Sequence, residues 1–125
     1  MMPARAPLLL IVTTGDAERL RGALTVACAE AALGGSVHIF LQLDAVALLS
    51  LPIVAPRDAD HAAHGLPTLA ALIDDGLALG VTMTACQSGL ALAGLAADAI
   101  DPRIAVGGPV GVLSRHGGED RLLLV

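Results

Sequence analysis

The sequence predicts a three-layer α/β domain, in which helices cover both faces of a doubly wound sheet of five parallel strands. Short apolar runs alternate with segments of helical periodicity five times along the chain, which is typical of a parallel sheet built from crossover units. The first run, residues 8–12, is apolar at every position, and strands covered on both faces show this pattern. The 125 residues suffice for a single domain, residues 1–125, with a core of its own.

The N-terminal half begins with a strand, a capped helix and a second strand. Asp16 is expected to cap the first helix, and Glu18 lies in its first turn near the positive end of the helix dipole. The pair Gly34 and Gly35 ends that helix. We expect, in order, a strand at 7–13, a helix at 17–33, a strand at 37–41, a helical turn at 44–49 and an irregular connection at 52–67.

The C-terminal half repeats the alternation. Leu69, Leu72, Ile73 and Leu77 recur at three- and four-residue steps and mark an amphipathic helix that ends near Gly80. We expect, in order, a helix at 69–80, a strand at 81–85, a helix at 88–95, a short strand at 104–106, a helix at 109–114 and a final strand at 122–125.

Strand order decides which loops meet. The common small doubly wound sheet has the flavodoxin-like order 2-1-3-4-5, and its ligand crevice opens between strands 1 and 3. In that order the loop of Thr13, Thr14 and Gly15 faces the end of the third strand, where Cys86 stands. We therefore expect Cys86 near Thr14 and Gly15, with Thr13 and Thr14 able to bind an oxyanion at the next helix N-terminus.

Cys86 is the leading candidate for chemistry. A thiol between a strand and a helix lies beside free backbone N–H groups and the positive end of the helix dipole. That environment lowers the pKa of a cysteine and favours the nucleophilic thiolate. Gln87 and Ser88 are candidates to donate N–H groups to the sulfur, or they are simply helix-start residues, with Ser88 as a cap. The alternative for Cys86 itself is a small buried apolar residue.

Composition excludes several kinds of chemistry. The chain has no lysine, and therefore no phosphate-binding lysine and no Schiff-base mechanism. It has no Trp or Tyr and one Phe, so it lacks an aromatic platform for bases or a flavin. The net charge of −5 argues against nucleic acid. We expect no organic cofactor and no nucleic-acid partner.

Three further side chains have simpler explanations. Cys28 lies on the apolar stripe of the first helix, which favours core packing. His61 and His64, beside Asp58 and Asp60, would suit a metal only if that stretch were helical, and no further ligand cluster is visible. We expect a solvated loop there and no metal site.

Location and assembly follow from the apolar composition. The apolar block near the N-terminus is too short and wrongly flanked for a signal peptide. The uncharged stretch 76–97 is interrupted by glycines and polar residues, so we interpret it as a buried strand and helix and expect no membrane association. Two distant cysteines favour a reducing, cytoplasmic location.

Because 55% of residues are hydrophobic, we expect a homo-oligomer whose contacts include the fifth strand and residues 91–95.

Three segments resemble the DsrE/DsrF-like sulfur-relay family in order and spacing: TTGDAERL at 13–20, GVTMTACQ at 80–87 and IAVGG at 104–108. The most specific part is the Ala-Cys-Gln step after a strand. The resemblance covers nearly the whole chain and implies a small flavodoxin-like fold, assembly as a trimer, hexamer or dimer, and sulfur carried as a persulfide at Cys86. The chain departs from the pattern in having no basic residues just after Cys86.

Two functions remain open. The first is a sulfur carrier or sulfurtransferase, in which Cys86 takes sulfane sulfur from a donor protein and passes it to an acceptor thiol. Each transfer follows the same attack and leaving-group steps as thiol–disulfide exchange. A second cysteine nearby would resolve the persulfide to a disulfide, and none is close in sequence. The second is a non-catalytic oligomeric protein that binds a small anion or a protein partner at the same crevice.

Overall fold

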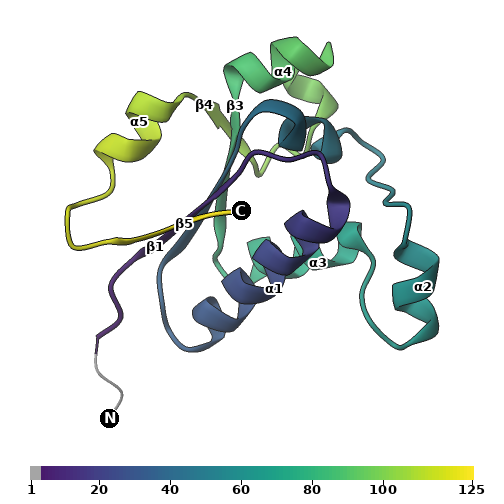
Figure 1. Ribbon diagram of the computed structural model, residues 1–125, viewed down its shortest axis with the longest axis horizontal. Helices are drawn as coiled ribbons and strands as arrows, with labels where there is room; N and C mark the ends of the chain where they lie inside the picture. The colour runs from purple at the N-terminus through teal and green to yellow at the C-terminus, as the bar shows by residue number, and fades with distance from the viewer. Residues whose placement is uncertain (1–3) are drawn as a thin grey trace.

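The computed structural model describes residues 4–125 and contains five parallel strands in the order β4-β3-β2-β1-β5 (Figure 1). The strands are β1 (Leu8–Val12), β2 (Val37–Leu41), β3 (Thr82–Cys86), β4 (Ala105–Gly107) and β5 (Arg121–Leu124). The α-helices are α1 (Ala17–Ala32), α2 (Asp58–Ala63), α3 (Leu69–Ala78), α4 (Gln87–Ala93) and α5 (Pro109–Ser114), and two 3₁₀ segments are η1 (Leu43–Leu49) and η2 (Ala97–Ala99).

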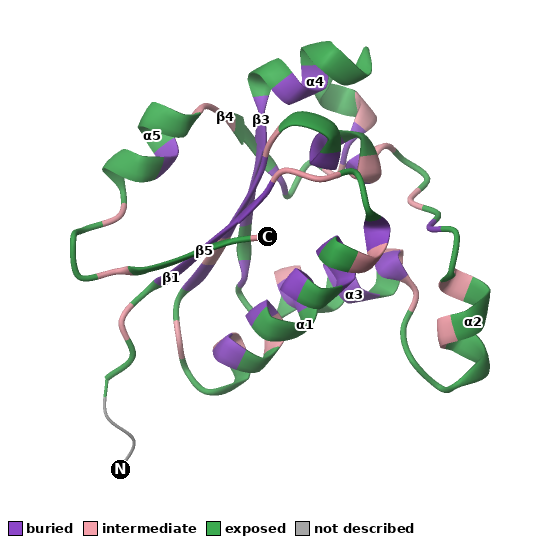
Figure 2. Ribbon diagram, in the orientation of Figure 1, coloured by how far each residue is buried: buried purple, intermediate pink, exposed green. Residues whose placement is uncertain are grey.

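Helices cover the sheet from both sides, so the predicted fold class, a three-layer doubly wound α/β domain of flavodoxin-like type, is confirmed. Helices α1 and α3 pack side by side on one face, and α5 lies on the other (Figure 1). The buried apolar residues are concentrated in the central strands and on the inner sides of α1 and α3 (Figure 2). Residues Leu8–Val12 of β1 are all buried, as expected for a strand inside a covered parallel sheet.

The expected adjacency of strands 1 and 3 is not found, because β2 lies between them. Crossovers between parallel strands are right-handed. The connections from β1 to β2 and from β2 to β3 step in the same direction and place α1 and α3 on the same face. Only the last connection, through α5, runs back across the sheet to put β5 beside β1. The reversal of strand order therefore lies between β1 and β5, away from the end of β3.

One helix interrupts the connection that the sequence predicts to be irregular. Helix α2 buries none of its residues, so it leaves no apolar periodicity in the sequence. It is held by Asp58, whose carboxylate accepts from the backbone N–H groups of Ala55 and Leu69 at 2.9 Å and from the Arg21 guanidinium at 3.0 Å. The bonds to Leu69 and Arg21 join residues 11 and 37 positions apart in the chain, so no local sequence pattern reveals them.

Candidate functional site: a thiol at the end of the third strand

Cys86 is the last residue of β3, and α4 starts at the next residue. The expected placement at the carboxyl end of strand 3 is confirmed. Cys86 is itself the N-cap residue of α4 and keeps an extended backbone conformation. Its sulfur therefore lies beside the first backbone N–H groups of the helix, which have no partner within the helix.

The thiol of Cys86 is surrounded by hydrogen-bond donors. Its Sγ lies 3.1 Å from the Oγ of Ser88. Burial by itself raises the pKa of the thiol, since only 3% of the residue is exposed. The Ser88 hydroxyl and the backbone N–H groups of Ser88 and Gly89 outweigh that effect, and the pKa of Cys86 lies below its ordinary value. The site therefore stabilises a thiolate despite its burial.

Close packing between α4 and η1 holds these donors in place. Gly89 lies directly against Val46, so that a Cβ at position 89 would overlap the valine side chain and lie 3.2 Å from the carbonyl oxygen of Leu43. Only a glycine allows α4 to approach η1 this closely. The N–H groups that face Cys86 are thereby held on a rigid contact between two segments.

The structure does not bring Thr13, Thr14 and Gly15 next to Cys86, and this corrects the expected crevice. The Thr14 hydroxyl accepts from the N–H of Asp16 at 3.1 Å and so shapes the turn into α1. A Cβ at Gly15 would lie 3.3 Å from the Cβ of Asp44, in η1. Strand β2 and segment η1 therefore lie between this loop and the thiol, because the strand order differs from the expected one.

The two residues that follow Cys86 differ in role. Ser88 contacts the sulfur, as described above, and combines a side-chain and a backbone donor. Gln87 is the first residue of α4 and has an exposed side chain. Of the two candidate donors named from the sequence, Ser88 is thus placed at the sulfur, whereas Gly89 is a donor that the sequence analysis missed.

Cys28, His61 and His64 lie away from the thiol. Cys28 is half-buried in a shallow groove between α1 and α3, with Leu72, Asp75 and Leu79. His61 lies on α2, which corrects the expected loop, and its Nε2 contacts both carboxylate oxygens of Glu18 at 3.0 and 3.1 Å. Within residues 4–125 no group of three metal-ligating side chains is found.

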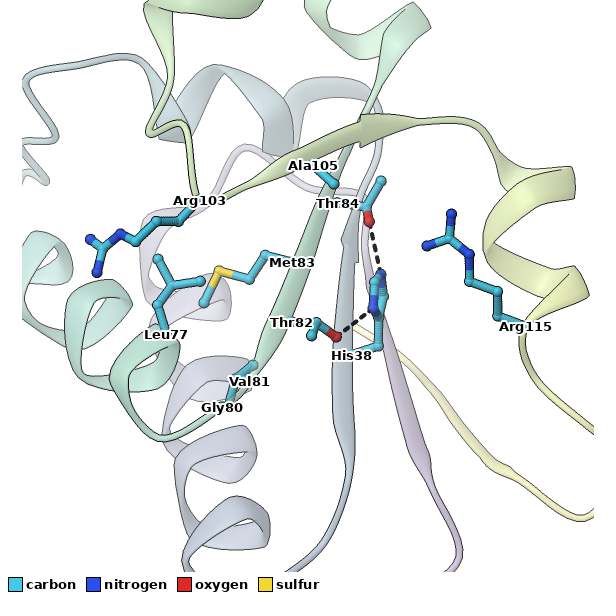
Figure 3. Close-up of a pocket in the computed structure, with 10 residues that line it drawn as sticks. All are labelled: His38, Leu77, Gly80, Val81, Thr82, Met83, Thr84, Arg103, Ala105 and Arg115. Atoms are coloured by element: carbon cyan, nitrogen blue, oxygen red, sulfur yellow. Dashed lines mark hydrogen bonds between the residues drawn. The ribbon is translucent and has the colours of Figure 1, made fainter.

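His38 is a polar residue that sequence reasoning missed. It lies on β2, with Nδ1 at 2.6 Å from the Thr82 hydroxyl and Nε2 at 3.0 Å from the Thr84 hydroxyl, both on β3 (Figure 3). Burial, followed by the charges of His116 and Arg115, lowers the pKa of His38 to about 4. The alternation of Thr82, Thr84 and Cys86 along one face of β3 was the available signal.

Comparison with solved structures supports the fold. The ychN protein from E. coli is 16% identical, with a TM-score of 0.77 over 97% of this chain and 100% of that one. The protein of unknown function MTH1491 from Methanobacterium thermoautotrophicum is 17% identical, with a TM-score of 0.67 over 97% and 100% of the two chains. The conserved protein of unknown function BT1422 from Bacteroides thetaiotaomicron is also 17% identical, with a TM-score of 0.68 over 96% and 95%. At these identities the likeness extends to the fold alone.

No family model matches the chain, and no curated protein matches its sequence. Along the described part of the chain, no helix is both long enough and apolar enough to cross a membrane.

Proposed function

We propose that the protein is a sulfur carrier or sulfurtransferase that holds sulfane sulfur as a persulfide on Cys86. The single observation that carries the proposal is the set of donors around this thiol, which lowers its pKa although it is buried. A thiolate is the species that attacks sulfur in exchange reactions. The sequence resemblance to the DsrE/DsrF-like family supports the same assignment.

The transfer needs no external oxidant. The Cys86 thiolate attacks the outer sulfur of a donor persulfide, the donor's S–S bond breaks, and the donor leaves as a thiolate. The bond formed at Cys86 is of the same kind as the bond broken. An acceptor thiolate then attacks the outer sulfur on Cys86 and regenerates the starting thiolate.

The position of the second cysteine favours carriage over disulfide chemistry. A Cβ at Gly76 would lie 3.6 Å from the Sγ of Cys28 and 3.4 Å from the methyl carbon of Met83. Met83 and Cys86 are three residues apart on β3, so their side chains point to opposite faces of the sheet. Cys28 therefore cannot reach Cys86 to discharge the persulfide as a disulfide.

Persulfide loading tests the proposal. Incubation with a cysteine desulfurase and cysteine, or with a small carrier protein already loaded with sulfur, is expected to add the mass of one sulfur, removable by reductant. The added sulfur maps to Cys86, Cys86→Ser abolishes the gain, and Cys28→Ser leaves it intact. Because Cys86 is 3% exposed, loading is expected to be slow. Loading of Cys28 alone, or of neither cysteine with both donors, would contradict the proposal and favour the non-catalytic binding protein.

The exposed apolar side chains support a homo-oligomer. The edge strand β5 exposes Leu122, Leu123 and Leu124, the last of them by 76%. Its outer edge has no partner strand within the described residues, and an uncovered apolar edge strand favours pairing with another chain. On α4, Leu92 is also exposed. A monomer at micromolar concentration in light scattering would contradict this assembly.

A further inference from the structure

The sheet face under α5 carries polar side chains next to an open groove. The groove has a volume of about 580 Å³, and its wall on this face consists of His38, Thr82, Thr84 and Arg115 (Figure 3). It exists because β4 pairs with β3 only from Thr84 onward, which leaves the start of β3 without a neighbour on that side. The groove continues around this free edge to Leu77, Met83 and Arg103.

Of the two arginines that line this groove, Arg115 is the one whose guanidinium has no carboxylate partner within residues 4–125 and is available to an anion. Five of the seven arginines form ion pairs with carboxylates: Arg5, Arg21, Arg57, Arg103 and Arg121. Arg103, at the far end of the groove, is thus held by Asp74 and Asp101. Arg115 has no carboxylate partner among residues 4–125, and Figure 3 shows its guanidinium directed from α5 toward His38 and Thr84. In an acidic protein, an unpaired arginine that points into a groove is the kind of group that binds an anion.

The hydrogen bonds of His38 indicate which ring nitrogen carries the proton before any anion binds. The Thr82 hydroxyl donates to the carbonyl oxygen of Val37 at 3.3 Å, so it accepts from the Nδ1–H of His38. The Nε2 atom of a neutral ring then accepts from the Thr84 hydroxyl. Protonation of Nε2 would reverse that last bond, and the hydroxyl proton of Thr84 would become free to turn toward the groove.

We propose that this groove is a binding site for a small oxyanion, held by Arg115 and by the hydroxyl of Thr84, with His38 taking up a proton as the anion binds. The occupant is a sulfate, phosphate or carboxylate group, either free or at the end of a small organic acid. The site is separate from the proposed sulfur chemistry of Cys86 and does not depend on it.

The charges around His38 set the pH dependence. Arg115 and His116 face the ring and oppose its protonation, the His116 ring at a centroid distance of 5.9 Å. Asp120 is hydrogen-bonded to His116 at 3.2 Å, and the β3 neighbours are the uncharged Thr82 and Thr84. A bound anion offsets the charge of Arg115 and favours the imidazolium. Affinity therefore rises as pH falls, by at most about tenfold per pH unit.

Sulfate is the first probe, because it keeps its charge throughout the accessible pH range. The full chain is titrated with sulfate at pH 6 and constant ionic strength, with chloride as the replaced ion, while the imidazole signals are followed by NMR. We expect a saturable shift of the His38 signal, a pKa of His38 that rises with sulfate, and little change at His61 and His64. Propionate in the same titration distinguishes an organic acid, which would bind more tightly than sulfate, from a free inorganic anion.

Two arginine variants decide the outcome. Arg115→Gln is expected to weaken sulfate binding by at least about tenfold, since a charge-assisted hydrogen bond is lost. Arg19→Gln is the matched control, because Arg19 is also exposed and unpaired within residues 4–125 but lies on α1. In His38→Gln, calorimetry is expected to find binding that no longer depends on pH. The proposal is overturned if His38 shows no saturable shift, if both arginine variants weaken binding equally, or if His38→Gln keeps the pH dependence.

Discussion

The two cysteines of the molecule differ in a way that exposure does not predict. Cys28 is the more exposed thiol, yet burial and the nearby charge of Asp75 raise its pKa. Cys86 is buried, yet its pKa is lowered. The difference lies in the neighbours: Cys28 lies in a groove of apolar residues and one carboxylate, whereas Cys86 faces a hydroxyl and two backbone N–H groups.

At Cys86 the three donors together outweigh the effect of burial on the pKa, whereas at Cys28 no such donors oppose it. The donors at Cys86 come from the first turn of α4, and that turn is held against η1 at Gly89. Cys28 lies in the middle of α1, where backbone N–H groups are already used within the helix. Gly89→Ala, Ser88→Ala and Asp75→Asn each change the surroundings of one cysteine and leave the other cysteine as an internal reference.

The largest effect is expected from Gly89→Ala. The new methyl group would overlap Val46 and press on the carbonyl of Leu43, so α4 must move away from η1. We expect a loss of about 1–3 kcal/mol in the free energy of unfolding, and a higher pKa of Cys86 as its donors retreat. Urea unfolding and thiol titration measure the two effects.

Gly111→Ala is the matched control for this variant. Gly111 lies in α5, and a Cβ there would meet nothing within 4 Å. This substitution is expected to leave stability unchanged or to raise it by up to about 1 kcal/mol. Equal destabilisation by both alanines would show that the contact between α4 and η1 has no special role.

Ser88→Ala removes the donor side chain nearest to the Cys86 sulfur. Because a hydrogen bond to a charged group contributes about 1.5 kcal/mol or more, we expect alkylation of Cys86 near neutral pH to slow by roughly tenfold. Alkylation of Cys28 in the same sample is expected to stay the same. Mass spectrometry of the two cysteine peptides over time provides the measurement, and an unchanged rate at Cys86 would remove Ser88 from the site.

The smallest effect is expected from Asp75→Asn, which acts on the other thiol. Its carboxylate opposes ionisation of Cys28, and a charge interaction near the protein surface amounts to a few tenths of a kcal/mol. Alkylation of Cys28 at pH 8 is therefore expected to rise about twofold, while Cys86 is unaffected. A twofold effect that persists in high salt would contradict an electrostatic origin.

Local patterns were sufficient for most of the fold. The apolar runs, the Asp16 cap and the glycine pair after α1 are each encoded within a few residues, and the structure has the corresponding elements close to the expected bounds. The position of Cys86 at the end of β3 follows from the same kind of signal. Helix α2 was missed because its hydrogen bonds, not its apolar residues, hold it in place.

Relations between distant segments could not be derived in this way. The neighbours of each strand depend on which face each crossover takes, and that is a property of the whole chain. For the same reason the loop of Thr13, Thr14 and Gly15 was placed beside Cys86, whereas η1 occupies the space between them. The contacts of His38 with Thr82 and Thr84 span more than forty residues, and the polar alternation along β3 does not reveal which strand pairs with it.

The central claim is that the buried Cys86, and not the more exposed Cys28, is the activated thiol. The most direct test is the pH dependence of alkylation of both cysteines in the unmodified protein. Each rate is expressed relative to its own plateau at high pH, so that the different accessibility of the two thiols to the reagent does not affect the comparison. A thiol whose pKa is lowered reaches half of its plateau rate at a lower pH than a thiol whose pKa is raised. We therefore expect the Cys86 midpoint at a lower pH than the Cys28 midpoint. A Cys86 midpoint at or above that of Cys28 would contradict the account.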